Sequence, residues 1–213
     1  MEKSLSKWPC VLVAVAVATP AFARHAPTQE ESGFTLALRT GYGASMGTFA
    51  GTMDMSDAIP GQLPLLLEAG YRINENILAG AYLEYGVATG TTKLLQGGSD
   101  ASGHTLRFGV EGIYHFMPEL SFSPWAGAGF GYEGGSVSAS NGFVENEVSF
   151  SGFEYLNLQV GADFHLARSF DLGPYLALSV ASYSSISEDN VDRSFSSGTH
   201  EWLRIGVKGT FNL

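Results

Sequence analysis

The chain has 213 residues, enough for one domain, and 45% of them are hydrophobic. Its formal net charge of −10 at pH 7 argues against a nucleic-acid partner, because phosphate backbones bind basic surfaces. Beyond residue 23, no run of about 20 consecutive apolar residues is present, which excludes an ordinary membrane-spanning helix there.

The N-terminal residues have the pattern of a secretory signal peptide. Two early lysines precede an apolar core over residues 11–19, and residues 21–23 form an A-x-A cleavage motif. We therefore expect a signal over residues 1–23, with residues 24–32 left as a short periplasmic tail. Cys10 is the only cysteine and lies inside the signal, so we expect no disulfide and no cysteine metal ligand afterwards.

Residues 33–213 contain eight runs with apolar side chains on alternate positions. This period of two is typical of β-strands with one apolar face. The predicted strands cover residues 34–43, 65–73, 77–87, 105–116, 122–133, 155–166, 172–181 and 202–213. The connections between them are alternately long and short, and the short ones lie at residues 74–76, 117–120 and 167–170.

Three features indicate that the apolar row faces lipid. The row carries no charge in the middle of any strand, as expected where a Lys or Arg would cost roughly 2–4 kcal/mol. The opposite row consists mostly of small residues, which fit where eight strands face a narrow axis. The alternating connections match the short periplasmic turns and longer outer loops of membrane barrels. The fold class predicted is an all-β, eight-stranded antiparallel up-and-down transmembrane β-barrel.

Aromatic side chains gather near both ends of the predicted strands, as in the interfacial girdles of membrane barrels. Those near the short turns are Phe34, Tyr71, Tyr114, Phe116, Phe122, Phe164 and Phe211. Those toward the long connections are Tyr42, Tyr85, Phe130 and Tyr132.

The final strand, LRIGVKGTFNL over residues 203–213, resembles the C-terminal signal that the barrel assembly machinery reads. Such C-terminal signals usually end in Phe or Trp, whereas this chain has Leu213 with Phe211 two places before it. With the eight-strand topology, the chain resembles the small OmpA/OmpX-type outer-membrane barrels. The resemblance implies a multi-pass, porin-like protein in the Gram-negative outer membrane, inserted by that machinery. It transfers no catalytic residue.

The inward row contains ten charged residues that we predict to form a network in the lumen. They are Arg39, Glu68, Arg72, Glu84, Arg107, Glu111, Glu133, Asp163, Arg204 and Lys208. Strand positions suggest that Arg39 pairs with Glu68 and Glu84 with Arg107, because a confined charge needs a partner. One interpretation is a polar plug that fills the narrow interior. The other is a gate whose ion pairs rearrange to pass small ions.

The histidines do not form a recognisable catalytic set. His115 and His165 face inward near the periplasmic end, while His104 and His200 are expected as exposed residues at the outer rim. No spacing brings a nucleophile, a base and an orienting acid together, so we predict no catalytic residue. The acidic outer loops lack a D-x-D-x-D-G motif, so we predict no metal site and no cofactor.

The first long connection is unusually apolar, with Met46, Phe49, Met53 and Met55. These side chains would either form a surface for a partner or hydrophobic ligand, or fold back over the barrel mouth.

We therefore predict a monomeric envelope protein with a structural or surface-loop interaction role. Its partners would be outer-membrane lipids and lipopolysaccharide. Two alternatives remain open: a narrow pore or carrier for small ions or small hydrophobic molecules, and an enzyme that modifies lipid A.

Overall fold

A computed structural model describes residues 33–51, 53–90, 100–140, 145–188, 191–193 and 198–213. The predicted signal and tail, residues 1–23 and 24–32, lie outside this range. The elements are β1 (Gly33–Ala50), β2 (Met53–Asp54), α1 (Met55–Ala58), β3 (Gly61–Arg72), β4 (Ile77–Thr89), β5 (Asp100–His115), β6 (Phe122–Ser140), β7 (Glu145–Ala167), β8 (Phe170–Glu188), β9 (Val191–Arg193) and β10 (Thr199–Asn212). No helix in the described part of the chain is long and apolar enough to cross a membrane.

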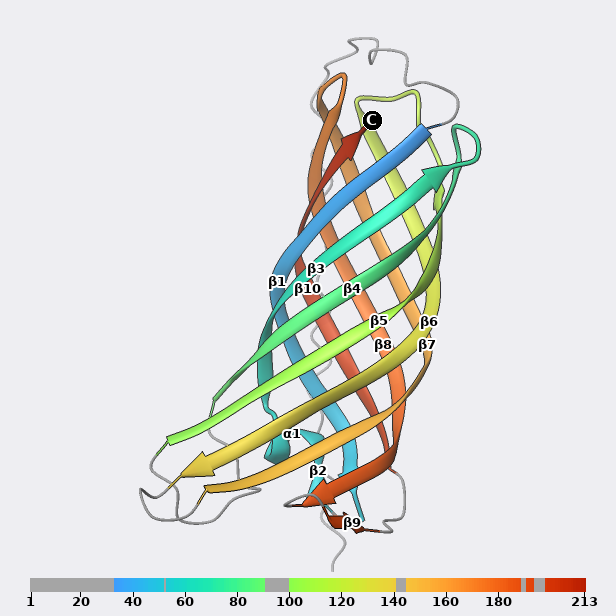
Figure 1. Cartoon of the computed structure of the whole chain (residues 1–213). Coiled ribbons are helices and arrows are strands. Elements are labelled where there is room, and N and C mark those ends of the chain that lie inside the picture. Colours follow the sequence, from blue (N-terminus) through green and yellow to red (C-terminus); the bar gives the residue numbers. More distant parts are fainter. Residues whose placement is uncertain (1–32, 52, 91–99, 141–144, 189–190, 194–197) are drawn as a thin grey trace, which may run out of the picture.

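Eight long strands form a closed antiparallel barrel, which confirms the predicted fold class. Each strand pairs with the next along the chain, in the order β1, β3, β4, β5, β6, β7, β8 and β10. The ring closes because β10 pairs with both β8 and β1, and Arg39 of β1 lies opposite Lys208 of β10. The short β2 and β9 pair with β1 and β8 near the end that carries the long connections (Figure 1).

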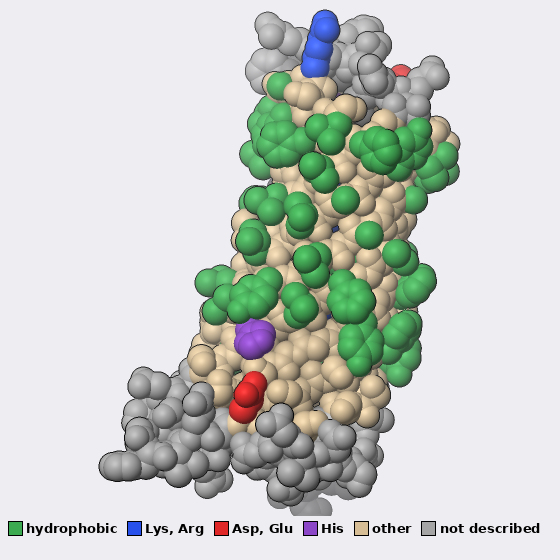
Figure 2. All heavy atoms as spheres, viewed as in Figure 1, with side chains coloured by type: hydrophobic (Ala, Val, Ile, Leu, Met, Phe, Trp, Pro, Cys, Tyr) green, Lys and Arg blue, Asp and Glu red, His purple; other side chains and the backbone are tan. Residues whose placement is uncertain are grey.

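The exterior of the barrel is apolar over most of its length. Most large side chains of the predicted lipid-facing row are exposed, including Leu67, Phe108 and Ile205. Figure 2 shows hydrophobic side chains over the body of the cylinder and a mostly polar surface toward the end with the long connections. An apolar exterior of this extent is stable in hydrocarbon rather than in water.

Several strands are longer at that end than the sequence predicts. Strand β6 reaches Ser140 instead of residue 133, and β7 begins at Glu145 instead of residue 155. In the added segments the outward positions are mostly Ser, Gly or Glu, whereas Val137, Val148 and Phe150 are buried, so the apolar outward row ends although the hydrogen-bond ladder continues. Hydrophobic periodicity therefore marks the part of a strand that faces lipid, not its full length.

A β-bulge in β7 corrects one predicted orientation. The alternation predicted for residues 155–166 places Tyr155 on the inward row with Asp163, but Tyr155 is 58% exposed, whereas its neighbour Glu154 is fully buried. The register between β7 and β8 shifts between Glu154 and Leu156. An extra residue in one strand reverses the inward and outward alternation on either side of it.

The first long connection folds back into the outer mouth of the barrel. Phe49, Met55, Ala58 and Ile59 are buried and belong to one apolar cluster with side chains of β6, β7, β8 and β10. The Ser45 hydroxyl donates to the Ile59 carbonyl at 2.5 Å, which ties the segment to β1. We call residues 49–59 the cap, of which residue 52 is not described. Met46 remains exposed on β1.

Cysteine labelling tests the position of the cap. Met55 is fully buried and its neighbour Ser56 is exposed. In folded protein whose Cys10 is absent or replaced, a membrane-impermeant maleimide should label Ser56→Cys rapidly and Met55→Cys at least about tenfold more slowly. Equal rates for the two variants would contradict a cap seated in the mouth.

Candidate functional site

The interior of the barrel is the candidate site, because it collects most of the charged side chains of the strands. All ten residues predicted for the lumen are buried, with exposed fractions of at most 5%. The structure adds Glu154, Asp171 and His200 to this buried set. Together they form three groups along the barrel, which we call the middle, outer and periplasmic-end networks.

The middle network is centred on Arg39. Its guanidinium donates to Glu68 and Gln159 and to Glu111 at 3.0 Å. The Gln159 amide also donates to Glu111 at 2.5 Å, so two of the three acceptors of Arg39 are joined. These contacts cross the barrel from β1 to β3, β5 and β7, and they occupy its narrow axis.

Lys208 adds a second cation to the middle network. Its ammonium lies 3.4 Å from Glu68 and 4.7 Å from the ring centroid of Trp125. The guanidinium of Arg39 lies 5.6 Å from the same ring. One indole thus contacts two neighbouring cations, and its π face offsets part of the cost of holding them side by side.

The outer network is centred on Arg107. Its guanidinium lies 2.9 Å from Glu84 and 3.6 Å from Glu133 and also pairs with Glu154. The Arg204 guanidinium, on β10, lies 3.3 Å from the Glu84 carboxylate, on β4. Three carboxylates can lie around one guanidinium because each of them also contacts another donor.

Neutral donors complete the outer network directly below the cap. Glu133 accepts from the Tyr183 hydroxyl at 2.8 Å and from the Trp202 indole at 3.0 Å. His200 lies 3.5 Å from Glu133 and stacks on Tyr183 with ring centroids 4.0 Å apart. The expected exposed position of His200 was therefore wrong: the side chain is fully buried against Tyr183 of β8.

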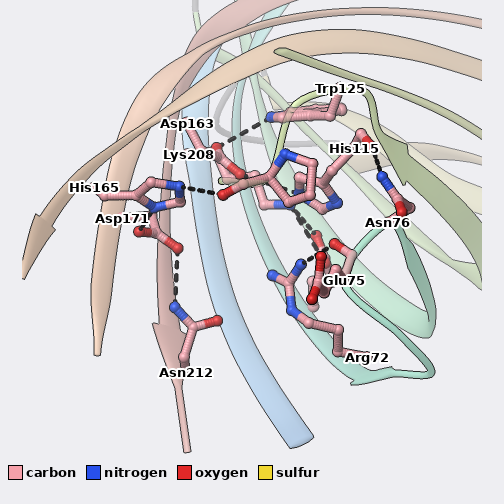
Figure 3. Close-up of polar contacts among 12 residues, drawn as sticks. Arg72, Glu75, Asn76, His115, Trp125, Asp163, His165, Asp171, Lys208 and Asn212 are labelled. Carbon is pink, nitrogen blue, oxygen red and sulfur yellow. Dashed lines mark hydrogen bonds and ion pairs between the residues drawn. The ribbon is translucent and has the colours of Figure 1, made fainter. Parts of the chain in front are cut away.

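The periplasmic-end network lies at the opposite mouth (Figure 3). His165 contacts Asp171 at 2.5 Å, and Asp171 also accepts from Asn212 at 2.9 Å. His115 lies 3.4 Å from Asp163, which accepts from the Trp125 indole at 3.0 Å.

Arg72 belongs to the same end of the barrel. It donates at 3.2 Å to the carbonyl of Glu75 in the first short turn. Its charge therefore stabilises a turn and is not part of a cross-barrel ion pair among the contacts described.

Glycines on neighbouring strands make room for the largest inward side chains. The Tyr82 ring lies across Gly109 and Gly131, and its hydroxyl donates to Glu154. A Cβ atom would lie 2.6 Å from that hydroxyl at Gly109 and 2.7 Å at Gly131, closer than real contacts allow. Part of the glycine content of the strands is thus required by close approach rather than by turns.

Sequence reasoning missed Glu154, Asp171 and His200 as members of the interior, and each omission has a physical explanation. Glu154 precedes the predicted start of its strand, and its direction depends on the bulge. Asp171 lies between a predicted short turn and the next predicted strand, and His200 precedes the predicted start of the last strand. In the part of the chain that is described, no group of three or more His, Cys, Asp or Glu side chains is arranged to hold a metal ion.

Comparisons with known proteins agree with this architecture. The family model described as outer membrane protein beta-barrel domain matches residues 10–206. The crystal structure of neisserial surface protein A has a TM-score of 0.52 and 15% identity, covering 84% of this chain and 98% of that chain. The outer membrane protein AlkL, determined in lipid bilayers, has a TM-score of 0.50 and 13% identity, covering 92% and 97%. OprG from Pseudomonas aeruginosa has a TM-score of 0.49 and 13% identity, covering 87% and 99%.

These identities are low, so the solved structures show a common fold and nothing further. No curated protein sequence matches this chain.

Removing Arg39 tests whether the middle network stabilises the barrel. Arg39→Ala would leave Glu68 and Glu111 buried without their main cation, a loss of about 3–5 kcal/mol in the free energy of unfolding. Arg168→Ala, in an exposed turn, is the matched control and should be close to wild type. Urea unfolding of the refolded proteins measures both, and equal midpoints would contradict the role assigned to Arg39.

Filling the space beside Tyr82 tests the glycine contacts. In Gly131→Ala the new Cβ atom must displace Tyr82 or the Phe108 carbonyl, which should cost about 1–3 kcal/mol of stability. Gly112→Ala is the matched control, because a Cβ atom there has no neighbour within 4 Å. The difference between the two urea midpoints is the quantity to measure. Equally stable variants would show that the close approach is not needed.

Proposed function

The chain belongs to the outer membrane protein β-barrel family, and from this premise we propose that it is a non-enzymatic structural protein that displays its long loops at the cell surface. Its location is the bacterial outer membrane, as for the proteins that share its fold. We further propose that it acts as a monomer, surrounded by outer-membrane lipids and lipopolysaccharide. Insertion by the barrel assembly machinery belongs to the same proposal.

One observation carries this proposal: the interior is filled along its length by fully buried ion pairs and closed at the outer mouth by the cap. Arg39 and Arg107 each contact carboxylates from more than one strand. Passing an ion would require separating such pairs, which costs several kcal/mol for each buried charge. The positions of the histidines also support a non-enzymatic role. His115, His165 and His200 each contact a carboxylate, and all three lie within the barrel.

A narrow pore is the competing function, because polar side chains line the interior from the periplasmic-end network to Glu133. Planar-bilayer recordings separate the two. A filled lumen predicts no regular single-channel steps for the wild-type protein, whereas a porin inserted in the same bilayers gives steps. Reproducible unitary steps that scale with protein concentration would overturn the structural proposal.

Complementation of a deletion strain tests the display of loops. Replacing residues 91–99 by a short Gly-Ser linker leaves every described strand unchanged in sequence. If the barrel acts only as an envelope element, this variant should restore resistance to detergent and large antibiotics as well as wild type does. If a loop carries an interaction, the variant should fold but fail to restore it.

A further inference from the structure

A groove of about 370 Å³ lies on the outside of the barrel across β5, β6 and β7, near the end with the long connections. It is separate from the lumen networks, because the side chains at its lipid end belong to the outward row. These are Leu106, Phe108 and Tyr132, all of which are exposed.

The strand register arranges the groove in three successive rows. Phe108 lies opposite Tyr132 in the row nearest the body of the barrel. Leu106 lies opposite Gly134 in the next row, where the absence of a side chain leaves the depression. The third row brings together His104, Ser136 and Ser149. The groove therefore changes from aromatic to polar along the barrel axis.

The walls of the groove are held in place by contacts of their own. The Tyr132 hydroxyl donates to the Ser151 hydroxyl at 2.9 Å, and the ring lies 5.9 Å from that of Phe108. The His104 ring stacks on Tyr85 with centroids 5.8 Å apart. A site whose side chains are fixed before binding loses little conformational freedom when a ligand enters.

The position of the groove determines what can reach it. Its aromatic end faces the hydrocarbon of the membrane, and its polar end lies where the apolar exterior gives way to the polar surface of the loop end (Figure 2). A molecule that fills both ends must have an acyl chain and a polar head at that depth, which describes a lipid of the outer leaflet. A soluble ligand would not cover Leu106 and Phe108.

The polar end favours a sugar head over a phosphate. None of the described residues that line the groove is Lys or Arg, and Glu147 adds a carboxylate. Ser136, Ser149, His104 and Glu147 suit hydroxyl and amide groups, whereas phosphate recognition in proteins relies on basic side chains. The part of a head group that fits in the groove is therefore a sugar with hydroxyl or amide groups, and any phosphates on that sugar would lie outside the groove.

We propose that this groove binds an outer-leaflet glycolipid. One acyl chain lies over Gly134 between Leu106 and Tyr132, and hydroxyl or amide groups of the sugar head bond to Ser149 and His104. The inference rests on the outer-membrane location alone and is independent of whether the lumen is closed.

The test fills the groove without disturbing the barrel. A Cβ atom at Gly134 would lie 3.4 Å from the Phe150 carbonyl and 3.5 Å from the Ser151 Cβ, which are ordinary contact distances. Gly134→Leu therefore occupies the groove. Gly112→Leu is the matched control, since it adds the same side chain to the lipid face away from the groove. Heat-modifiable gel mobility confirms that both variants fold.

Native mass spectrometry of the detergent-solubilised proteins, titrated with purified lipid A or phosphatidylethanolamine, gives the readout. We expect wild type and Gly112→Leu to retain one lipid A, and Gly134→Leu to bind it about tenfold more weakly. Ser149→Ala should weaken lipid A binding about fivefold, as for one lost hydrogen bond, and leave phosphatidylethanolamine unaffected. Unchanged lipid A binding by Gly134→Leu would overturn the site, and equal binding of the two lipids by wild type would overturn the glycolipid assignment.

Discussion

The pairing of β10 with β1 is the interaction on which the rest of this structure depends. Hydrocarbon offers no hydrogen-bond partner to a backbone amide or carbonyl, so a sheet can lie in a membrane only if it has no free edge. Thirteen residue pairs, from Thr35 and Asn212 to Gly47 and His200, close the ring between the first and last ring strands. Closure at eight strands then fixes a narrow interior, and that narrowness decides which side chains can point inward.

Two kinds of inward residue satisfy that limit. Glycines remove side-chain volume, so that Tyr82 can lie flat against the neighbouring strands. Charged residues fill the remaining space in mutually paired groups, because an isolated charge on the axis would be held in a medium that solvates it poorly. Buried carboxylates outnumber buried arginines and lysines in the part of the chain described, and hydroxyl and indole donors such as Tyr183 and Trp202 supply the difference. The interior thus holds buried polar networks beside an apolar cluster that includes Leu78, Ile113 and Tyr175, and an apolar wall surrounds both.

Much of this arrangement could be predicted from the sequence, because lipid and lumen impose a strict period of two on each strand. The eight segments and the inward direction of Arg39 and Glu68 follow from that period, and the ring order follows from the alternating long and short connections. The bulge at Glu154 could not be predicted, since one inserted residue changes no composition and only reverses the alternation locally. The outer ends of β6 and β7 were missed for a related reason. Their apolar side chains Val137, Val148 and Phe150 face inward to the cap, so the lipid-facing pattern ends although the hydrogen bonding continues. His200 is buried against Tyr183, on which Phe49 of the cap also packs, and these contacts join residues too far apart in the chain for a local pattern to predict.

The two ends of the barrel are closed in different ways, and this asymmetry bears on function. At the periplasmic end, His165, Asp171 and Asn212 form a polar cluster next to short turns that have little freedom to move. At the outer end, the closure is an apolar segment held mainly by packing against Phe150, Tyr183 and Trp202. Packing of this kind is not directional, so a cap can tolerate changes in the loop around it while still excluding water from Glu133 and His200. The interior is therefore insulated from the loops, which leaves the loops and the lipid-facing exterior as the surfaces on which this protein can acquire specificity without losing its fold.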